Sequence, residues 1–311
     1  MNTIEQAASR LAQLRNAGVD ASAEAKVEPT IAVPEINGVP SALRVEDERD
    51  FVAPTSRGDN ETGRPDQLSF RAPHVTIDME RLSAMGYVSP HAPSSRRAEE
   101  FRMIKRPLLN NVRGNSAAPV LNANRIMVTS SLPREGKTFV SINLALSIAL
   151  ERDTTVLLID ADATRPMVLE RLALPPAKGL LDVLSEPELD VQTVLLQTNV
   201  ERLSILPAGT LQEQATELLA SKRMSALVDK LAARYPNRIL VFDAPPLLGS
   251  TESRVLAAHM GQVVLVIEAD RTTQRQVNDA LVTVESCPVV MTLLNKASSS
   301  EAGSYYGSRT H

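Results

Sequence analysis

From Arg125 onward the chain alternates short apolar runs with amphipathic segments, and this alternation constrains the fold more than any other feature of the sequence. The apolar runs have the length of buried strands, and the segments between them, such as 138–150 and 272–285, have the period of helices. Strands that alternate with helices pair in parallel through right-handed crossovers. The sequence therefore predicts an α/β fold with a doubly wound, mostly parallel sheet of the P-loop NTPase type. The predicted strands are 126–129, 156–159, 203–206, 239–242, 263–267 and 289–294.

The segment 130–138 follows the first predicted strand and precedes a helix, which is the position of a phosphate-binding loop. In such a loop the backbone N–H groups and the positive end of the helix face one point. Residues 136–138 match the end of the G-x-x-x-x-G-K-[ST] motif, whereas Ser131 replaces its first glycine. We predict that this loop binds the phosphates of ATP, with Lys137 at the terminal phosphates and Thr138 on Mg²⁺. The predicted nucleotide-binding residues are Pro133, Arg134, Glu135, Gly136, Lys137 and Thr138.

Two further predicted strands run into acidic residues at the same edge of the sheet. The strand 156–159 is followed by Asp160 and Asp162, and the strand 239–242 is followed by Asp243. A carboxylate at the end of an apolar strand is costly unless it meets water, a cation or a metal. Together with the Gly-Lys-Thr loop, these residues predict a magnesium site.

Composition limits the functions open to the chain. A net charge of -4 and a pI near 5.7 give no general attraction to nucleic acid, and an aromatic content of 3% disfavours base-stacking surfaces. The single cysteine, Cys287, excludes an internal disulfide and is expected to be a core residue. No apolar run approaches the roughly 20 residues that a membrane-spanning helix needs. We therefore expect a cytoplasmic protein with no membrane span and no zinc site.

The first 95 residues differ in composition from the rest. Residues 1–17 have the spacing of an amphipathic helix, and 18–95 have the composition of a mostly disordered linker with a short helix near 76–86. A helix is expected to open near Arg97, with Pro107 ending or kinking it. The predicted organisation is thus helix, linker, a catalytic domain at 96–297, and a flexible tail at 298–311.

The three motifs and their order resemble those of the bacterial tyrosine kinases, which have a P-loop fold with Walker A, Walker A′ and Walker B motifs. The resemblance implies an ATP- and Mg²⁺-dependent protein-tyrosine kinase with Lys137, Asp160 and Asp162 as catalytic residues. Thr138, Asp162 and Asp243 would hold the metal. We assign Asp160 to the incoming tyrosine hydroxyl and Asp162 to the metal, and the exchange of these two roles stays open.

Other residues agree with this resemblance. Glu99, Arg102 and Lys105 match the family's oligomerisation motif E-x-x-R-x-x-R except for the final lysine, although such a pattern also suits a solvated helix face. Tyr305 and Tyr306 resemble the C-terminal tyrosines that family members phosphorylate on one another, with a disordered end as the alternative. Asn295 follows the last strand, where related P-loop proteins contact the base.

The chain is most similar to the autokinases associated with exosortase and exopolysaccharide systems. That similarity implies regulation of exopolysaccharide biosynthesis or export, and recruitment to the inner membrane by a separate membrane-spanning activator that resembles chain-length determinants. Two alternatives remain. One is a partitioning or septum-positioning ATPase, although these carry a second lysine where this chain has Leu132. The other is a nucleotide-gated adaptor without kinase activity.

Overall fold

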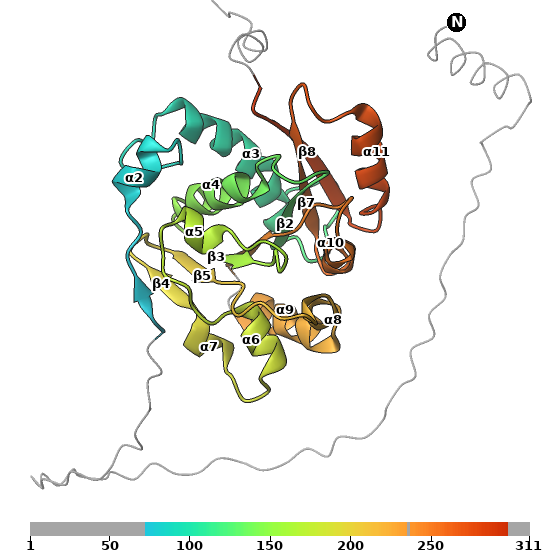
Figure 1. Ribbon diagram of the computed structural model, residues 1–311. Helices are drawn as coiled ribbons and strands as arrows, with labels where there is room; N and C mark the ends of the chain where they lie inside the picture. The colour runs from blue at the N-terminus through green and yellow to red at the C-terminus, as the bar shows by residue number, and fades with distance from the viewer. Residues whose placement is uncertain (1–71, 235–236, 298–311) are drawn as a thin grey trace, which may run out of the picture. The chain divides into compact units, whose positions relative to one another are not determined.

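The computed structural model describes residues 72–234 and 237–297, which belong to one compact unit, 64–311 (Figure 1). Their strands form one sheet in the order β1-β4-β5-β3-β6-β2-β7-β8, and every neighbouring pair is parallel except β4 and β5. The predicted α/β fold is confirmed. The helix predicted at 1–17, most of the linker and the tail lie outside the described residues. The strands are β1 (His74–Val75), β2 (Arg125–Ser130), β3 (Thr155–Asp160), β4 (Leu196–Thr198), β5 (Leu203–Leu206), β6 (Arg238–Asp243), β7 (Gln262–Glu268) and β8 (Val289–Asn295).

Helices cover both faces of the sheet because successive side chains of each buried strand point to opposite faces. In β3, Val156 and Leu158 pack under the helices of one face, and Leu157 and Ile159 pack under those of the other. The first face carries α2 (Met79–Ala84), α3 (Arg96–Val112), α4 (Lys137–Ala149) and α5 (Val168–Arg171). The second face carries α6 (Leu180–Ser185), α7 (Val191–Val194), α8 (Ala215–Leu219), α9 (Lys222–Arg234), α10 (Thr251–Ala257) and α11 (Gln274–Val282).

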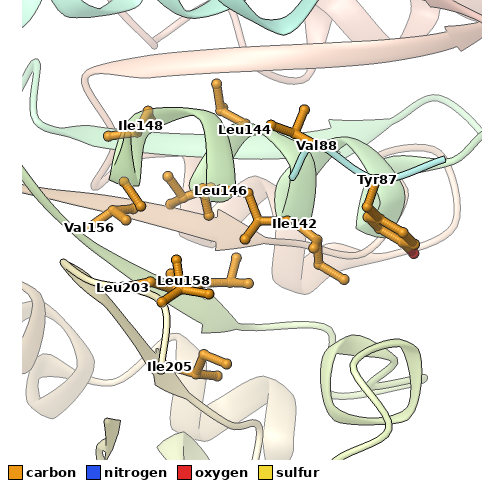
Figure 2. Close-up of a cluster of buried hydrophobic side chains, with 14 of the residues drawn as sticks. Tyr87, Val88, Ile142, Leu144, Leu146, Ile148, Val156, Leu158, Leu203 and Ile205 are labelled. Atoms are coloured by element: carbon orange, nitrogen blue, oxygen red, sulfur yellow. The ribbon is translucent and has the colours of Figure 1, made fainter. Parts of the chain in front are cut away.

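Helix α4 lies at the centre of the first face, and all its residues except Phe139 are buried. Figure 2 shows Ile142 and Leu146 of α4 directed toward residues of β3 and β5, whereas Leu144 lies on the opposite side of the helix. This apolar contact fixes the helix that begins at Lys137. The N-terminus of α4, and with it the phosphate-binding loop, therefore has a rigid support.

Pro107 does not end α3, although the sequence predicted that it would end or kink this helix. The helix continues through Pro107 to Val112. Proline removes one backbone donor and disturbs the preceding turn, but Leu108 and Leu109 beyond it are buried against the core. Their burial keeps the last turn of the helix in place. The helix predicted near 76–86 is shorter than expected, Met79–Ala84, and is capped by Asp78, whose side chain accepts a hydrogen bond from the N–H of Arg81.

We expect Leu146→Ala to lower the free energy of unfolding by about 2–5 kcal/mol, because it opens a cavity between α4 and the sheet. Leu146 is 2% exposed. Urea denaturation followed by circular dichroism measures the change. Leu211→Ala is the matched control, since Leu211 is 54% exposed, and its effect should stay within about 0.5 kcal/mol. Equal effects of the two substitutions would contradict the packing assigned to α4.

Candidate active site

The strand order brings three chain segments to one edge of the sheet. β6 lies between β2 and β3, so the loop after β2 and the acidic ends of β3 and β6 are neighbours. Asp160 and Asp243 are direct partners in the β3–β6 register. Ligands of parallel α/β sheets bind beyond the carboxyl ends of the strands. The residues predicted from three separate motifs are therefore brought together here.

The loop between β2 and α4 has the backbone conformation of a tight phosphate-binding turn. Gly136 has φ +100°, and a Cβ atom there would lie 2.2 Å from the Nδ2 atom of Asn295. Arg134 also has a positive φ, +73°. Lys137 and Thr138 then open α4, so backbone N–H groups at the helix start face the ligand edge.

Lys137 is held by two carboxylates. Its Nζ atom lies 2.6 Å from Asp162 Oδ2 and 3.7 Å from Asp243 Oδ1. Burial by itself would lower the pKa of Lys137, but the charges of Asp243 and Asp162 outweigh burial and raise the pKa above its ordinary value. Lys137 is therefore a protonated, positively charged group beneath the loop.

Asp243 is fully buried, and burial raises its pKa. Its Oδ1 atom accepts a hydrogen bond of 3.0 Å from Ser141 Oγ, and its side chain also hydrogen-bonds that of Thr138. Its Oδ2 atom has no hydrogen-bond partner among the described residues. A buried, unpartnered carboxylate oxygen beside a threonine hydroxyl suits a hard cation such as Mg²⁺.

Asp160 and Asp162 have different environments although they are two residues apart. Burial, and next the charge of Asp243, raise the pKa of Asp160 to about 8. Both Asp160 oxygens accept backbone N–H groups, from Val168 at 3.0 Å and from Asp162 at 3.3 Å. Asp162 lines the cavity described below, and Asp160 does not. Asp160 thus supports the loop that carries Asp162.

No group of three or more His, Cys, Asp or Glu side chains in 72–234 and 237–297 is arranged to hold a metal ion. Asp160, Asp162 and Asp243 therefore do not converge as one ligand set. Mg²⁺ usually takes one or two protein ligands and completes its shell with phosphate oxygens and water. Thr138 and Asp243 could supply these one or two protein ligands.

A cavity of about 1700 Å³ opens over the loop. Its walls include the loop, Asp162, the first turns of α3 and the end of β8. An aromatic pair, Tyr87 and Phe139, forms another part of the wall, with ring centroids 4.8 Å apart and the Arg97 guanidinium 5.3 Å from the Phe139 centroid. Ligand pockets usually measure about 300–1000 Å³, so the space exceeds what a nucleotide alone needs. No sequence motif identified these aromatic residues.

Asn295, predicted to contact the base, does line the cavity. Its side-chain amide, however, donates a hydrogen bond of 2.9 Å to the backbone carbonyl of Glu135. The Glu135 side chain, predicted only as part of the loop backbone, is 1% exposed. Lys296 was not predicted at all, yet its Nζ atom donates to the Arg134 carbonyl at 2.8 Å. Apart from the position of Asn295 after a strand, nothing in the sequence indicated these contacts.

Lys105 does not share a surface with Glu99 and Arg102, as the oligomerisation motif would require. Glu99 and Arg102 form an ion pair on the outside of α3, whereas Lys105 is 5% exposed. Six residues at about 100° each turn Lys105 some 120° away from Glu99. Its Nζ atom lies 2.7 Å from Glu151 Oε1 and donates to the Ser147 carbonyl at the end of α4. Lys105 therefore joins α3 to α4.

We expect Glu151→Gln to destabilise the protein by about 1–2 kcal/mol at pH 7, since it weakens the bond to Lys105. Burial raises the pKa of Glu151, but its hydrogen bonds to Lys105 and Arg113 outweigh burial and lower the pKa below the usual value. The stabilisation is thus complete above the unfolded-state pKa of about 4.3 and is lost as the pH falls through the folded-state pKa.

Urea denaturation of both proteins between pH 3 and pH 7 measures this dependence. The difference in the free energy of unfolding should shrink toward pH 3. Glu188→Gln is the control, because Glu188 lies exposed in a turn. A difference that stays constant over this pH range would contradict the role given to the Glu151 carboxylate.

The chain is similar to known proteins both in sequence and in structure. Residues 133–292 match the AAA domain family. The tyrosine-protein kinase YwqD of Bacillus subtilis is 30% identical over 222 residues, which are 70% of this chain and 89% of YwqD. The succinoglycan biosynthesis transport protein ExoP of Rhizobium meliloti is 30% identical over 235 residues, 74% of this chain but only 28% of ExoP.

Two solved structures share the architecture. The kinase domain of the Escherichia coli tyrosine kinase ETK superposes with a TM-score of 0.58 at 25% identity, over 72% of this chain and 90% of that domain. The VpsO kinase domain gives a TM-score of 0.54 at 28% identity, over 66% of this chain and all of that domain.

Proposed function

Because the chain belongs to the bacterial tyrosine-protein kinases, we propose that it transfers the terminal phosphate of ATP to its own C-terminal tyrosines, Tyr305 and Tyr306. The observation that carries the proposal is the buried group of Lys137, Asp162 and Asp243 at the start of α4, with Asp162 and Lys137 on the wall of a large cavity. A charged lysine beneath a phosphate-binding loop and a carboxylate facing the same space are what phosphoryl transfer to a hydroxyl requires.

The loop binds and orients the nucleotide in this proposal. Backbone N–H groups of residues 133–138 hold the phosphates, and the Lys137 ammonium offsets charge on the β- and γ-phosphates. Thr138 and the unpartnered Oδ2 atom of Asp243 would hold Mg²⁺. When bound, Mg²⁺ supplies positive charge that stabilises the transferred phosphoryl group.

In this proposal Asp162, which we assigned to the metal from the sequence, accepts the tyrosine hydroxyl, and Asp160 has a structural role. The Oδ1 atom of Asp162 is fixed by the Thr164 hydroxyl at 2.7 Å and the Arg165 N–H at 2.9 Å, and its Oδ2 atom meets Lys137. Once Lys137 contacts the phosphates, Oδ2 is free to accept a hydrogen bond from the tyrosine hydroxyl. The tyrosine oxygen then bonds to the γ-phosphorus, the bond to the β–γ bridging oxygen breaks, ADP leaves, and Asp162 takes the hydroxyl proton.

The cellular role is inferred from the relatives. ExoP is named for succinoglycan biosynthesis and transport, and we infer a similar link to exopolysaccharide biosynthesis or export for this chain. Within the described residues, no helix is long and apolar enough to cross a membrane. A separate membrane-spanning activator, of the chain-length-determinant kind, would recruit the cytoplasmic kinase to the inner membrane.

Phosphorylation between copies requires that two copies meet, and we infer that they do so in a homo-oligomer. Glu99 and Arg102 are accessible for such contacts, with side chains 54% and 35% exposed. Lys105 is buried within the chain and is left out of this proposal.

We expect Lys137→Met to abolish ATP-dependent phosphotyrosine, because it removes the charge that faces the phosphates. Incubation of the purified protein with ATP and Mg²⁺, followed by mass spectrometry of the C-terminal peptide, tests this directly. A variant with Tyr305→Phe and Tyr306→Phe should bind ATP as the parent does while losing the modified peptide. Persistent phosphotyrosine in Lys137→Met would refute the mechanism, and ATP hydrolysis without any phosphotyrosine in the parent would favour the ATPase alternative.

We expect Glu99→Ala combined with Arg102→Ala to reduce the oligomer mass measured by light scattering, because the substitutions remove the proposed intermolecular partners. Tail phosphorylation at low protein concentration should slow in parallel. Arg275→Ala is the matched control, since the Arg275 side chain is 89% exposed on α11. An unchanged mass in the double variant would contradict this interface.

A further inference from the structure

The phosphate-binding loop is held by side chains at and after the ends of the last two strands. At the end of β8, Asn295 donates to the Glu135 carbonyl at 2.9 Å, and Lys296 donates to the Arg134 carbonyl at 2.8 Å. After the end of β7, the Thr272 hydroxyl hydrogen-bonds the Glu135 carboxylate. Two consecutive peptide groups of the loop, those that carry the Arg134 and Glu135 carbonyls, are thus held by side chains from distant parts of the chain.

Arg134 occupies a backbone conformation that non-glycine residues rarely adopt. Its φ of +73° lies in the left-handed region, where a Cβ atom is disfavoured by contact with the backbone. Two other non-glycine residues with positive φ, Asp270 and Lys296, lie in the segments that follow β7 and β8. Such conformations persist only where surrounding contacts enforce them, and they concentrate at functional sites.

Lys296 is placed to enforce the conformation of Arg134. Its Nζ atom bonds the Arg134 carbonyl and also lies 3.0 Å from Glu268 Oε2 at the end of β7. Glu268 is in turn paired with Arg271 at 3.2 Å. The Lys296 ammonium group is therefore held both by the Glu268 carboxylate of β7 and by the Arg134 carbonyl of the loop.

The buried Glu135 side chain hydrogen-bonds within the loop and to the segment after β7. Its Oε2 atom accepts a hydrogen bond of 2.7 Å from the N–H of Leu132, three residues earlier in the same loop. Its Oε1 atom accepts the hydroxyl of Thr272. A buried carboxylate with both oxygens satisfied fixes the turn that Lys296 and Asn295 hold from the β8 side.

We propose that Lys296 is a positioning residue for nucleotide binding. It holds the Arg134 peptide in the left-handed conformation, so that the following N–H groups of the loop face the phosphates. The inference rests on the proposed binding of ATP at this loop. Lys296 touches the loop through a backbone carbonyl rather than through a reacting atom, so its effect should fall on nucleotide affinity and not on the chemical step.

The first experiment compares Lys296→Ala with the parent protein in full-length form. We expect a fluorescent ATP analogue with Mg²⁺ to bind about five- to tenfold more weakly, with kcat at saturating ATP within about twofold of the parent. Lys178→Ala is the matched control, since Lys178 is an exposed lysine paired with Glu186 at 2.9 Å, far along the chain from the loop. Unchanged nucleotide affinity in Lys296→Ala, or a loss confined to kcat, would overturn the proposal.

The second experiment tests the strain itself through a double-mutant cycle. Arg134→Gly adopts the left-handed conformation without penalty, so Lys296→Ala made in that background should weaken nucleotide binding by less than about twofold. A loss as large as in the parent background would show that Lys296 acts otherwise, and would refute the inference.

The binding measurement separates this inference from the proposed function. If the parent protein binds nucleotide but forms no phosphotyrosine, the kinase proposal fails while the cycle still tests Lys296. If the parent protein binds no nucleotide, both proposals fall together. Thermal unfolding of each variant shows whether the fold is kept.

Discussion

The buried pairing of Lys137 with Asp162 and Asp243 is the interaction on which the rest of the site depends. Burying a charge away from water costs free energy unless an opposite charge lies beside it. Removing one partner of a buried pair is strongly destabilising, because the other charge is then left buried and unpaired. The three residues come from three different places at one edge of the sheet: Lys137 follows the loop after β2, Asp162 follows β3, and Asp243 ends β6. The electrostatic requirement therefore fixes the start of α4 and the ends of β3 and β6 relative to one another. The edge of the sheet where the ligand is expected to bind is thus organised around the ammonium group of Lys137.

This arrangement explains why the two acidic residues of the β3 end serve different purposes. Asp160 still lies in the strand and is covered by its neighbours, so its oxygens accept hydrogen bonds from the backbone N–H groups of Asp162 in the loop that follows and of Val168 at the start of α5. Asp162 lies where the chain has left the sheet and reached the cavity. One carboxylate shapes the loop, and the other faces the space where an acceptor hydroxyl would enter.

Much of the fold was predictable because local sequence determines it. Apolar runs marked the strands β2, β3, β5, β6, β7 and β8, and the Gly-Lys-Thr and Asp motifs marked the ligand edge. The sequence did not predict the two-residue β1 and the three-residue β4, because strands of this length are too short to show an alternation of apolar and polar residues. The sequence predicted Lys105 on an exposed surface of α3. Its burial could not be predicted, because the ion pair with Glu151 depends on how α3 packs against α4. The contacts of Thr272, Asn295 and Lys296 with the phosphate-binding loop join residues far apart in sequence, and no local pattern indicates them.

The close approach of Asn295 to Gly136 has a consequence for how this loop can vary. The Nδ2 atom of Asn295 lies where a side chain at position 136 would begin, and the φ of Gly136 independently requires glycine. The two residues share one small volume although they are distant in the chain. A side chain at position 136 would therefore displace the Asn295 amide from its hydrogen bond with Glu135. The final glycine of a motif usually treated as local is thus also constrained by the last strand of the domain.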